Sequence, residues 1–364
     1  MTQEQLIYTF DQFKHASEYV SFKELASGHI NDTFLIETKA EPFFIVQRIN
    51  HSVFKDVPGL LSNKVSISRH IQNKLSYLSD EELHRQVLRF VQAKNGDYYH
   101  KDKHGDYWNV MIYIKDSVTH DVVSNAKIAY EGGKLSGNFL NLTSDFDTSN
   151  LTEVIPKFHD MPYRFWQFEQ ALKVASEDRK SKARVYLLKV AELKEEMHII
   201  QKLKESGQLK LRVTHNDTKI SNVLFDKHDN GLCVIDTDTV MPGVVHYDFG
   251  DAIRTICNTA AEDETNLDLV HFNIEFYRAY KKGFLEKVAS TLSPLEINTL
   301  PIGAKTMIFI MALRFLTDYL NNDIYYKTKY PEHNLDRAKN QFKLIDSMVH
   351  QMDVIKTKNV YSMD

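Results

Sequence analysis

The sequence predicts an α+β protein with two lobes, the first rich in strands and the second rich in helices. Three observations support this prediction. The first third of the 364 residues contains short alternating runs rich in Phe, Val, Ile and Thr, which are typical of strands. The remainder shows long helical periods, and 13 glycines and 8 prolines are few for a turn-dense all-β fold. Two such parts imply two lobes with a cleft between them, where we expect the active site.

The N-terminal third is expected to contain two helices and five strands. A short amphipathic helix covers residues 3–15, and Gly28 separates the first two strands. The elements that follow are strands at 19–25, 33–38 and 43–49, a helix at 60–78, and strands at 87–92 and 108–114. A polar run then links the lobes, so we divide the chain into residues 1–114, 115–121 and 122–364.

The C-terminal part is expected to be mainly helical, with two short strands. Helical periods cover residues 125–142, 165–175, 182–205, 267–284, 294–320 and 333–355, and the apolar runs lie at 223–225 and 232–235. No repeat with a period of 20–50 residues is visible, which excludes solenoid and propeller architectures.

The composition excludes several classes of protein. A net charge of −4 gives no support for a nucleic-acid partner. The two cysteines, Cys233 and Cys257, have neither the spacing of a zinc site nor that of a disulfide framework. Residues 1–15 lack the apolar core of a signal peptide, and the most apolar stretch, 307–316, is too short to span a bilayer. We therefore expect a cytoplasmic protein without a membrane partner.

One constellation of polar residues indicates phosphoryl transfer. Asp217 follows His215 by two residues, Asn222 follows Asp217 by five, and Asp236 ends an apolar run fourteen residues later. A kinase needs a carboxylate to accept the proton of the attacking hydroxyl, and a carboxylate and an amide to hold the Mg²⁺ that bridges the phosphates. We therefore predict an ATP-dependent kinase with Asp217 as base, and Asp236 and Asn222 as Mg²⁺ ligands. Lys219 is expected to neutralise charge on the transferred group.

Other residues near this constellation have different expected roles. His215 is expected to hold the loop by hydrogen bonds. Asp238 is left open between a contact with metal or substrate and an exposed turn carboxylate. The triplet Asp248-Phe249-Gly250 is a literal D-F-G, but it lies too far beyond the asparagine to take the metal. We expect Asp248 to bond backbone groups of the catalytic loop, and Gly250 to begin a helix.

Several longer motifs resemble those of the aminoglycoside phosphotransferase and choline kinase group, which shares the protein kinase fold. Within this group the sequence is most similar to the bacterial N-acetylhexosamine 1-kinases. The similarity extends over nearly the whole chain. It rests on motifs that include Gly28-His-Ile-Asn-Asp-Thr33, Arg212-Val-Thr-His-Asn-Asp-Thr-Lys219, Arg314-Phe-Leu-Thr-Asp-Tyr-Leu320 and Asp323-Ile-Tyr-Tyr-Lys-Thr-Lys-Tyr-Pro-Glu-His-Asn334. The last of these is the most distinctive, and the last two are not generic kinase motifs.

The resemblance implies that ATP and Mg²⁺ are used to phosphorylate the anomeric hydroxyl of N-acetylglucosamine or N-acetylgalactosamine. It implies a nucleotide-binding N-terminal lobe, with Gly28 in the glycine loop and adenine held by backbone groups at 112–114. The catalytic loop and the acceptor site then belong to the C-terminal lobe. By the same resemblance, the acceptor contacts are Asp217, His29, Asn31, Arg314 and Tyr325, with Arg254 as a weaker candidate. An Arg fork and a Tyr hydroxyl suit sugar hydroxyls. The sequence gives no oligomeric state.

Two departures from the wider kinase pattern concern the phosphates. Gln47 stands where most members carry a phosphate-binding lysine on the third strand, and residues 58–79 contain no Asp or Glu to pair with such a lysine. The loop around Gly28 also has one glycine where protein kinases have three. We expect that Gln47, Arg48 or the glycine loop holds the phosphates by another route.

Three alternatives follow from the same residues. The first is the same chemistry on another acceptor, such as homoserine, choline or ethanolamine, a methylthio sugar or an aminoglycoside. The second is a pseudokinase or binding module, which only the missing Lys–Glu pair favours. The third is a phosphoesterase that uses Asp236 and Asp238, although the 16 histidines are scattered and do not suggest a two-metal site.

Overall fold

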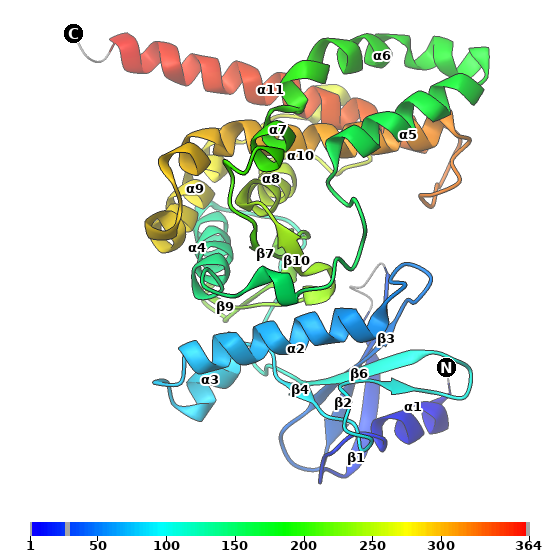
Figure 1. The fold of residues 1–364 in the computed structure, drawn as a ribbon, viewed down its shortest axis with the longest axis vertical. Coiled ribbons are helices and arrows are strands. Elements are labelled where there is room, and N and C mark those ends of the chain that lie inside the picture. The colour runs from blue at the N-terminus through cyan, green and yellow to red at the C-terminus, as the bar shows by residue number, and fades with distance from the viewer. Residues whose placement is uncertain (1, 26–29, 362–364) are drawn as a thin grey trace.

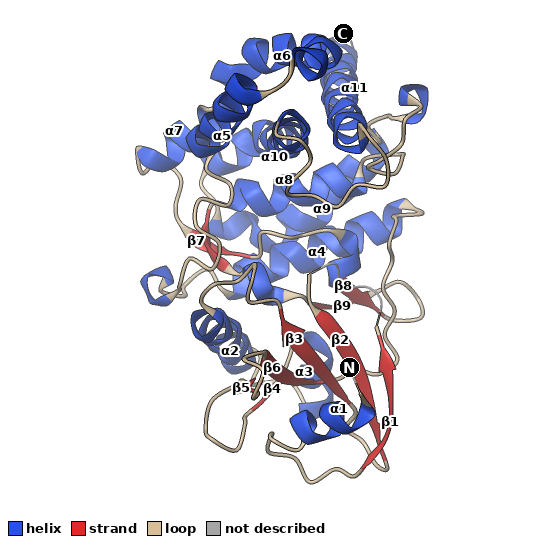
Figure 2. Cartoon of the chain, turned by 90° about the vertical axis from the view of Figure 1, so that its right-hand side faces the viewer, coloured by secondary structure: helices blue, strands red, loops and turns tan. Residues whose placement is uncertain are grey.

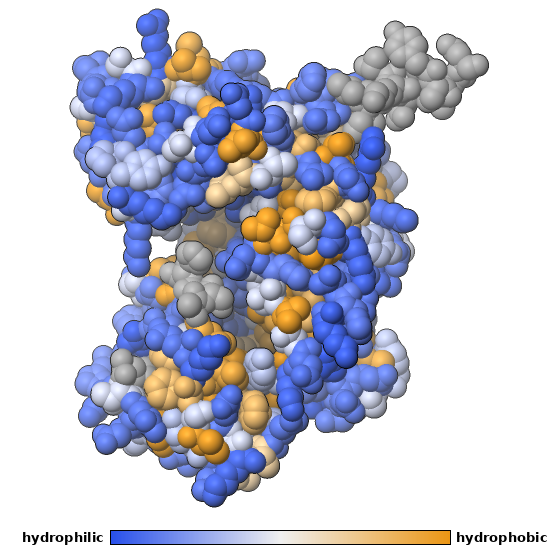
Figure 3. Space-filling model, turned by 180° about the vertical axis from the view of Figure 1, so that it is seen from behind, coloured by the Kyte–Doolittle hydropathy of each residue, from blue (hydrophilic) through white to orange (hydrophobic). Residues whose placement is uncertain are grey.

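The structure is a computed structural model that describes residues 2–25 and 30–361. It contains two lobes, a sheet-based N-terminal lobe and a larger helical lobe (Figures 1 and 2). The expected α+β two-lobe architecture is therefore confirmed. Seen from behind, the surface is hollowed between the lobes (Figure 3).

The N-terminal lobe is built on a six-stranded antiparallel sheet with the order β1-β2-β3-β6-β4, in which β5 also pairs with β6. Leu6 and Phe10 of the helix α1 (Gln3–Phe10) pack in one buried cluster with Phe34 and Trp108 of the sheet. The strands are β1 (Tyr19–Glu24), β2 (Asp32–Thr38), β3 (Phe44–Ile49), β4 (Phe90–Val91), β5 (His100–Lys101) and β6 (Tyr107–Ile112).

The helix α2 (Val57–Lys74) lies between this sheet and the C-terminal lobe (Figure 1). Asp56 caps its first turn by accepting a hydrogen bond from the backbone N–H of Gly59 at 2.9 Å. Asn63 ties it to the other lobe, because Nδ2 donates to the carbonyl oxygens of Thr152 and Val240 at 2.8 and 2.9 Å. These contacts fix the helix at the boundary between the lobes.

A short helix, α3 (Asp80–Gln86), follows and was not expected from the sequence. Ser79 and Glu82 form a capping box at its start, in which each side chain bonds the other residue's backbone N–H. The Ser-x-x-Glu pattern is a recognised sign of a helix start, so the signal was present in the sequence.

The C-terminal lobe packs its helices around the buried α10 (Pro294–Leu320). The other helices are α4 (Ala126–Leu142), α5 (Met161–Val174), α6 (Glu177–Met197), α7 (Ile199–Glu205), α8 (Val245–Ile256), α9 (Ile274–Val288) and α11 (His333–Tyr361). Two small antiparallel pairs, β7 (Arg212–Thr214) with β10 (Met241–Gly243) and β8 (Val223–Phe225) with β9 (Gly231–Val234), lie next to the cleft.

Helix α8 corrects one expectation. It begins at Val245, so Gly250 lies in its middle and does not begin it. A Cβ at Gly250 would come within 2.6 Å of the carbonyl oxygen of Gly303, so the glycine serves close packing against α10. Val244 at its N-terminus provides no side-chain cap, and the helix is held by the burial of most of its residues.

Helix α10 is long and apolar enough to cross a membrane by length and composition, and is the one such helix in the part of the chain that the structure describes. Its most apolar window is 67% buried inside the C-terminal lobe, as in the core helix of a water-soluble domain. The sequence marked only 307–316 as strongly apolar, because the flanking turns contain polar residues. Cys233 and Cys257 are buried and not bonded to each other.

The chain between the lobes runs through residues 113–125. Val118 pairs with Phe225 of β8, with both backbone hydrogen bonds at 2.9 Å. The segment expected to link the lobes is therefore attached to the edge of the C-terminal lobe, directly beside the loop that carries Asp217.

Helices α4 and α9 pack closely through glycines. A Cβ at Gly137 would overlap the carbonyl oxygen of Phe284, and a Cβ at Gly133 would overlap that of Tyr280. Gly283 of α9 faces the carbonyl oxygen of Tyr130 in the same way. Because each of these glycines faces backbone atoms of the other helix, no flexible side chain could move aside to make room for a Cβ.

We predict that Gly137→Ala lowers the free energy of unfolding by about 1–3 kcal/mol, because the added methyl overpacks a backbone contact. In an unobstructed helix the same change would raise stability by about 1 kcal/mol, so the sign of the effect is diagnostic. Urea denaturation measures it. A variant as stable as the unmodified protein would contradict the close approach of α4 and α9.

Candidate active site

The hollow between the lobes is a cavity of about 650 Å³, which is the size of a small-molecule site. Its roof comes from the sheet, including Gln47 of β3, and its back from Lys64 of α2. Residues 111–114 form one side, and the floor contains Asp217, Lys219, Asn222, Asp236 and Asp238. The structure thus brings together in one cavity residues that lie almost 200 positions apart in sequence.

Asp217 lies in the loop between β7 and β8, and its carboxylate has two close partners. The Nδ2 of Asn222 donates to Asp217 Oδ2 at 2.9 Å and to the Asp217 carbonyl oxygen at 2.8 Å. The Nζ of Lys219 lies 3.2 Å from the same carboxylate oxygen. Asp217 is half-buried, so its carboxylate is held in position and still borders the cavity.

The loop itself is held by buried groups beneath it. The carboxylate of Asp248 accepts the backbone N–H groups of His215 and Asn216 at 2.8 and 2.7 Å. The ring of His215 bonds the carbonyl oxygen of Ile235 at 2.9 Å and the N–H of Asp217 at 3.3 Å. The expected roles of Asp248 and His215 in supporting the loop are therefore confirmed. Burial raises the pKa of Asp248 to about 6.

Asp236 follows β9 and adopts a left-handed backbone conformation, with φ 56°. Burial and the neighbouring carboxylates of Asp238 and Asp217 raise its pKa to about 7. Burial lowers the pKa of Lys219, but Asp217 and Asp236 outweigh this and raise it. The floor of the cavity is therefore short of positive charge, which is the condition under which carboxylates bind cations.

The donor set fits a divalent cation that is shared with a ligand. Among the described residues, no group of three or more His, Cys, Asp or Glu side chains is arranged to hold a metal by itself. The expected pair, Asp236 and Asn222, offers a carboxylate and an amide oxygen, because Asn222 uses Nδ2 for its bonds to Asp217. Mg²⁺ is usually held by one or two carboxylates together with phosphate oxygens and water.

The sequence left open whether Asp238 is an exposed turn carboxylate, and the structure answers this. It is buried, with 3% exposure, and is not an exposed turn carboxylate. Its carboxylate accepts hydrogen bonds from Asn31 Nδ2 and from Lys64 Nζ. Asn31 also accepts the N–H of Asn50 at 2.8 Å, so both ends of its amide are engaged on the nucleotide side of the cleft. The sequence reasoning placed Asn31 at the acceptor and overlooked Lys64.

Other expected contacts fall elsewhere. Gly28 and His29 lie outside the described residues. Arg48 pairs with Asp32 and Asp106 on the outer part of the sheet and does not line the cavity, which removes it from the expected phosphate contacts. Arg254 is paired with Asp251 at 3.0 Å and with Glu262 at 2.8 Å.

The expected adenine contacts lie on the side of the cavity. Ile112, Tyr113 and Ile114 all line it. The N–H groups of Ile112 and Tyr113 already donate to the carbonyl oxygens of Arg89 and Phe43, both at 2.9 Å. Neither of these two N–H groups is therefore free to donate to a ligand.

Arg314 and Tyr325, expected at the acceptor, lie together in the C-terminal lobe. The guanidinium of Arg314 lies 5.9 Å from the ring centre of Tyr325 and 5.5 Å from that of Tyr326. Asp318, one turn later on α10, fixes this loop by accepting the N–H groups of both tyrosines at 2.8 and 2.9 Å. This region is separate from the cavity that contains Gln47 and Asn31.

The sequence reasoning missed a set of polar groups beside Arg314. Arg164 bonds the carbonyl oxygen of Phe158 at 2.6 Å, and burial together with the charge of Arg314 lowers its pKa to about 10. His159 is buried with neither ring nitrogen bonded, and the hydroxyl of Tyr326 is also without a partner. Other buried side chains of the described residues, such as Asn109 and Tyr280, also have atoms without a partner, so these groups do not by themselves mark a ligand site.

Comparison with known proteins identifies the family and the fold. A model of the phosphotransferase enzyme family matches residues 21–280, which is well over half of the chain. The chain is similar to amicoumacin kinase solved with AMP-PNP and Ca²⁺, at 13% identity and a TM-score of 0.61, over 95% of this chain and 94% of that one.

Two further solved structures are similar over nearly their whole length. A microcompartment-associated aminopropanol kinase has 12% identity and a TM-score of 0.60, over 97% of this chain and 98% of that one. Choline kinase from Cryptosporidium parvum Iowa II has 14% identity and a TM-score of 0.59, over 96% and 97%. The expected protein-kinase-like fold is confirmed by these likenesses.

The different roles of the two buried aspartates predict opposite responses to the same substitution. Asp248→Asn turns one acceptor oxygen into a donor facing a backbone N–H, so the free energy of unfolding should fall by about 1–3 kcal/mol. Asp236→Asn removes one of three mutually repelling carboxylates and should leave stability unchanged or raised without divalent cations. Urea denaturation of both variants in EDTA checks this. Equal losses would contradict the assignment.

Proposed function

The chain belongs to the phosphotransferase enzyme family of small-molecule kinases, and on that basis we propose that it phosphorylates the anomeric hydroxyl of N-acetylhexosamines with ATP. The observation that carries the kinase chemistry is the juxtaposition of Asp217, Asn222 and Asp236 at one cavity between the lobes. The choice of acceptor is supported by the sequence resemblance and by the charges near Arg314.

In the proposed reaction, a carboxylate oxygen of Asp217 accepts the proton of the anomeric hydroxyl. The sugar oxygen attacks the γ-phosphorus of ATP, the bond to the bridging oxygen breaks, and ADP leaves with the negative charge. The 3.2 Å contact of Lys219 with Asp217 brings an ammonium close to the transferred group. The hydrogen bond from Asn222 orients the carboxylate, so the base does not have to be positioned during the reaction.

Asp236 and the amide oxygen of Asn222 are the proposed ligands of a divalent cation, which we take to be Mg²⁺. When bound there, such a cation would supply positive charge to offset that of the phosphates. The raised pKa of Asp236 is consistent with this role, because a nearby cation would offset the repulsion from Asp217 and Asp238.

Charge near the proposed acceptor site favours a polyol over an amine. In the described part of the chain, neither Arg164 nor Arg314 lies within salt-bridge distance of a carboxylate; Arg314 contacts the sulfur of Met311 and three aromatic rings. Two unpaired guanidinium groups would repel a quaternary ammonium or an aminoglycoside. They can instead donate hydrogen bonds to sugar hydroxyls and to an acetamido oxygen. Buried donors at His159 and Tyr326 extend this surface.

We predict that Asp217→Asn lowers kcat by about 10²–10⁴-fold while the fold and ATP binding persist, because it removes the general base only. Coupled ADP release measures kcat, and circular dichroism checks the fold. Asp346→Asn on α11 is the control, since its carboxylate pairs with Lys189 far along the surface. Unchanged turnover in the Asp217 variant would refute the assignment of the base.

The acceptor is tested with a panel assayed for ADP release, containing N-acetylglucosamine, N-acetylgalactosamine, homoserine, choline, ethanolamine, a methylthio sugar and an aminoglycoside. We expect the N-acetylhexosamines to give the highest kcat/KM and phosphorus NMR to show an anomeric phosphate. Turnover with an amino alcohol and none with the sugars would overturn the sugar proposal and leave the kinase chemistry standing.

A further inference from the structure

The phosphate-binding lysine that is missing from β3 has a counterpart on α2. Gln47, at the position on β3, is 7% exposed and lines the cavity, paired in register with Thr33 and Asn109 of the neighbouring strands. Lys64 on α2 is 2% exposed and lines the same cavity. Its Nζ lies 3.4 Å from Gln47 Oε1. The strand therefore supplies the amide and the helix supplies the ammonium.

Lysine is rarely buried to this degree unless it is paired. Lys64 forms an ion pair with Asp238, whose side chain is equally buried. An ammonium has three N–H donors, and two of them are directed to Asp238 and Gln47. Lys64 lines two cavities, one of which also contains Asp217 and Asp236, and the third donor is left for a group in one of them.

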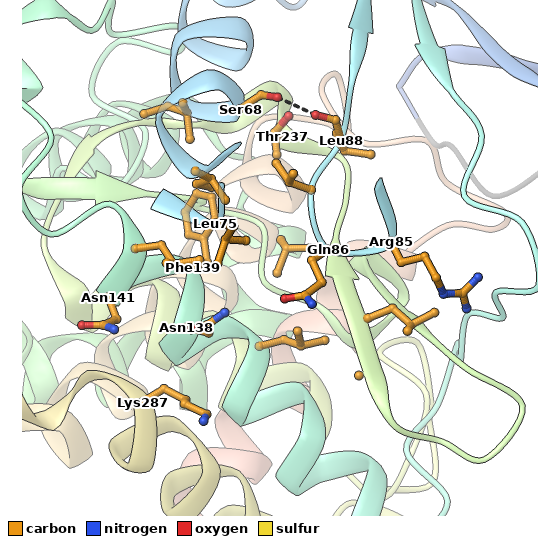
Figure 4. Close-up of a pocket in the computed structure, with 18 of the residues that line it drawn as sticks. Ser68, Leu75, Arg85, Gln86, Leu88, Asn138, Phe139, Asn141, Thr237 and Lys287 are labelled. Atoms are coloured by element: carbon orange, nitrogen blue, oxygen red, sulfur yellow. Dashed lines mark hydrogen bonds between the residues drawn. The ribbon is translucent and has the colours of Figure 1, made fainter. Parts of the chain in front are cut away.

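The backbone of α2 on either side of Lys64 is fixed. Asn63 bonds both the carbonyl oxygen and the N–H of Thr152, at 2.8 and 2.9 Å. One turn later, the hydroxyl of Ser68 donates to the carbonyl oxygen of Leu88, on the side of α2 that faces a second cavity of about 630 Å³ (Figure 4). The position of the ammonium is thus set before any ligand binds, which favours binding by reducing the loss of side-chain entropy.

Lys64 also lines the same cavity as Asp236, the proposed ligand of the cation. We propose that Lys64 binds the phosphate chain of ATP from α2, with Gln47 and Asp238 holding the ammonium in place. This assignment rests on the proposed function, since it needs a nucleoside polyphosphate in the cavity. It explains how the site works without a lysine on β3.

The test compares three adenosine ligands that differ only in the number of their phosphates. ATP, ADP and adenosine are titrated by calorimetry, with excess Mg²⁺, into the full chain and into Lys64→Met. We expect ATP and ADP to bind about 10–100-fold more weakly to the variant, because a charge-assisted hydrogen bond is lost. Adenosine should bind within about twofold of the unmodified protein, since its contacts lie elsewhere.

Two further variants control for charge and position. Lys74→Met removes the same charge from the end of the same helix, where the lysine side chain is 41% exposed and pairs with Asp145. It should leave the affinities for ATP, ADP and adenosine unchanged. The exchange variant Gln47→Lys/Lys64→Gln returns the lysine to β3 and should recover ATP affinity relative to Lys64→Gln. If Lys64→Met does not fold, Lys64→Met/Asp238→Asn replaces it, because that variant leaves no lone buried carboxylate.

Two results would overturn the assignment. One is unchanged ATP affinity in Lys64→Met, and the other is an equal loss for ATP, ADP and adenosine, which would mean that Lys64 has only a structural role. The titrations need no acceptor. A selective loss of ATP and ADP binding in a protein that phosphorylates no sugar would reject the acceptor proposal and support the role of Lys64. Phosphorylation of N-acetylhexosamines together with unchanged ATP affinity in Lys64→Met would support the acceptor proposal and reject the role of Lys64.

Discussion

Three carboxylates, those of Asp217, Asp236 and Asp238, line one partly buried cavity, and their repulsion determines what else the site must contain. Asp238 is compensated by the buried ammonium of Lys64, and Asp217 by Lys219. Asp236 has no such direct partner among the described residues, and its pKa is raised as a result. A cation shared with phosphates would complete this balance, so the nucleotide and the metal would each depend on the other for binding.

The contacts that compensate the charge of Asp238 also hold the two lobes together. Asp238 comes from the C-terminal lobe, whereas its two partners, Asn31 and Lys64, come from the N-terminal lobe. Asn63, next to Lys64, adds uncharged hydrogen bonds across the same boundary. The relative position of the lobes and the charge state of the cavity are therefore maintained by one set of contacts. The C-terminal floor is held separately, through Asp248 and the backbone of the loop around Asp217.

The acceptor side has the opposite character. Its buried groups are guanidinium, imidazole and phenol, and several of them have no partner in the described part of the chain. The solved structures to which the chain is similar include an aminopropanol kinase and a choline kinase. The fold is common to these proteins, whereas the proposed acceptor region of this chain carries two guanidinium groups without a carboxylate partner among the described residues, and function depends on the site and not on the fold.

The sequence by itself determined the two lobes and the catalytic loop, because periodicity and the spacing of Asp217, Asn222 and Asp236 are local properties of the chain. It also identified the absence of a lysine at Gln47. Only the tertiary structure showed that the ammonium of Lys64 lies beside Gln47, 3.4 Å from its Oε1. That lysine lies in register with buried Leu60, Ile67 and Ile71, so the helical period contained a signal. Packing between the lobes decides which face of α2 borders the cavity and which carboxylate pairs with the ammonium. Lys64 and Asp238, which form this pair, lie more than 170 residues apart in sequence.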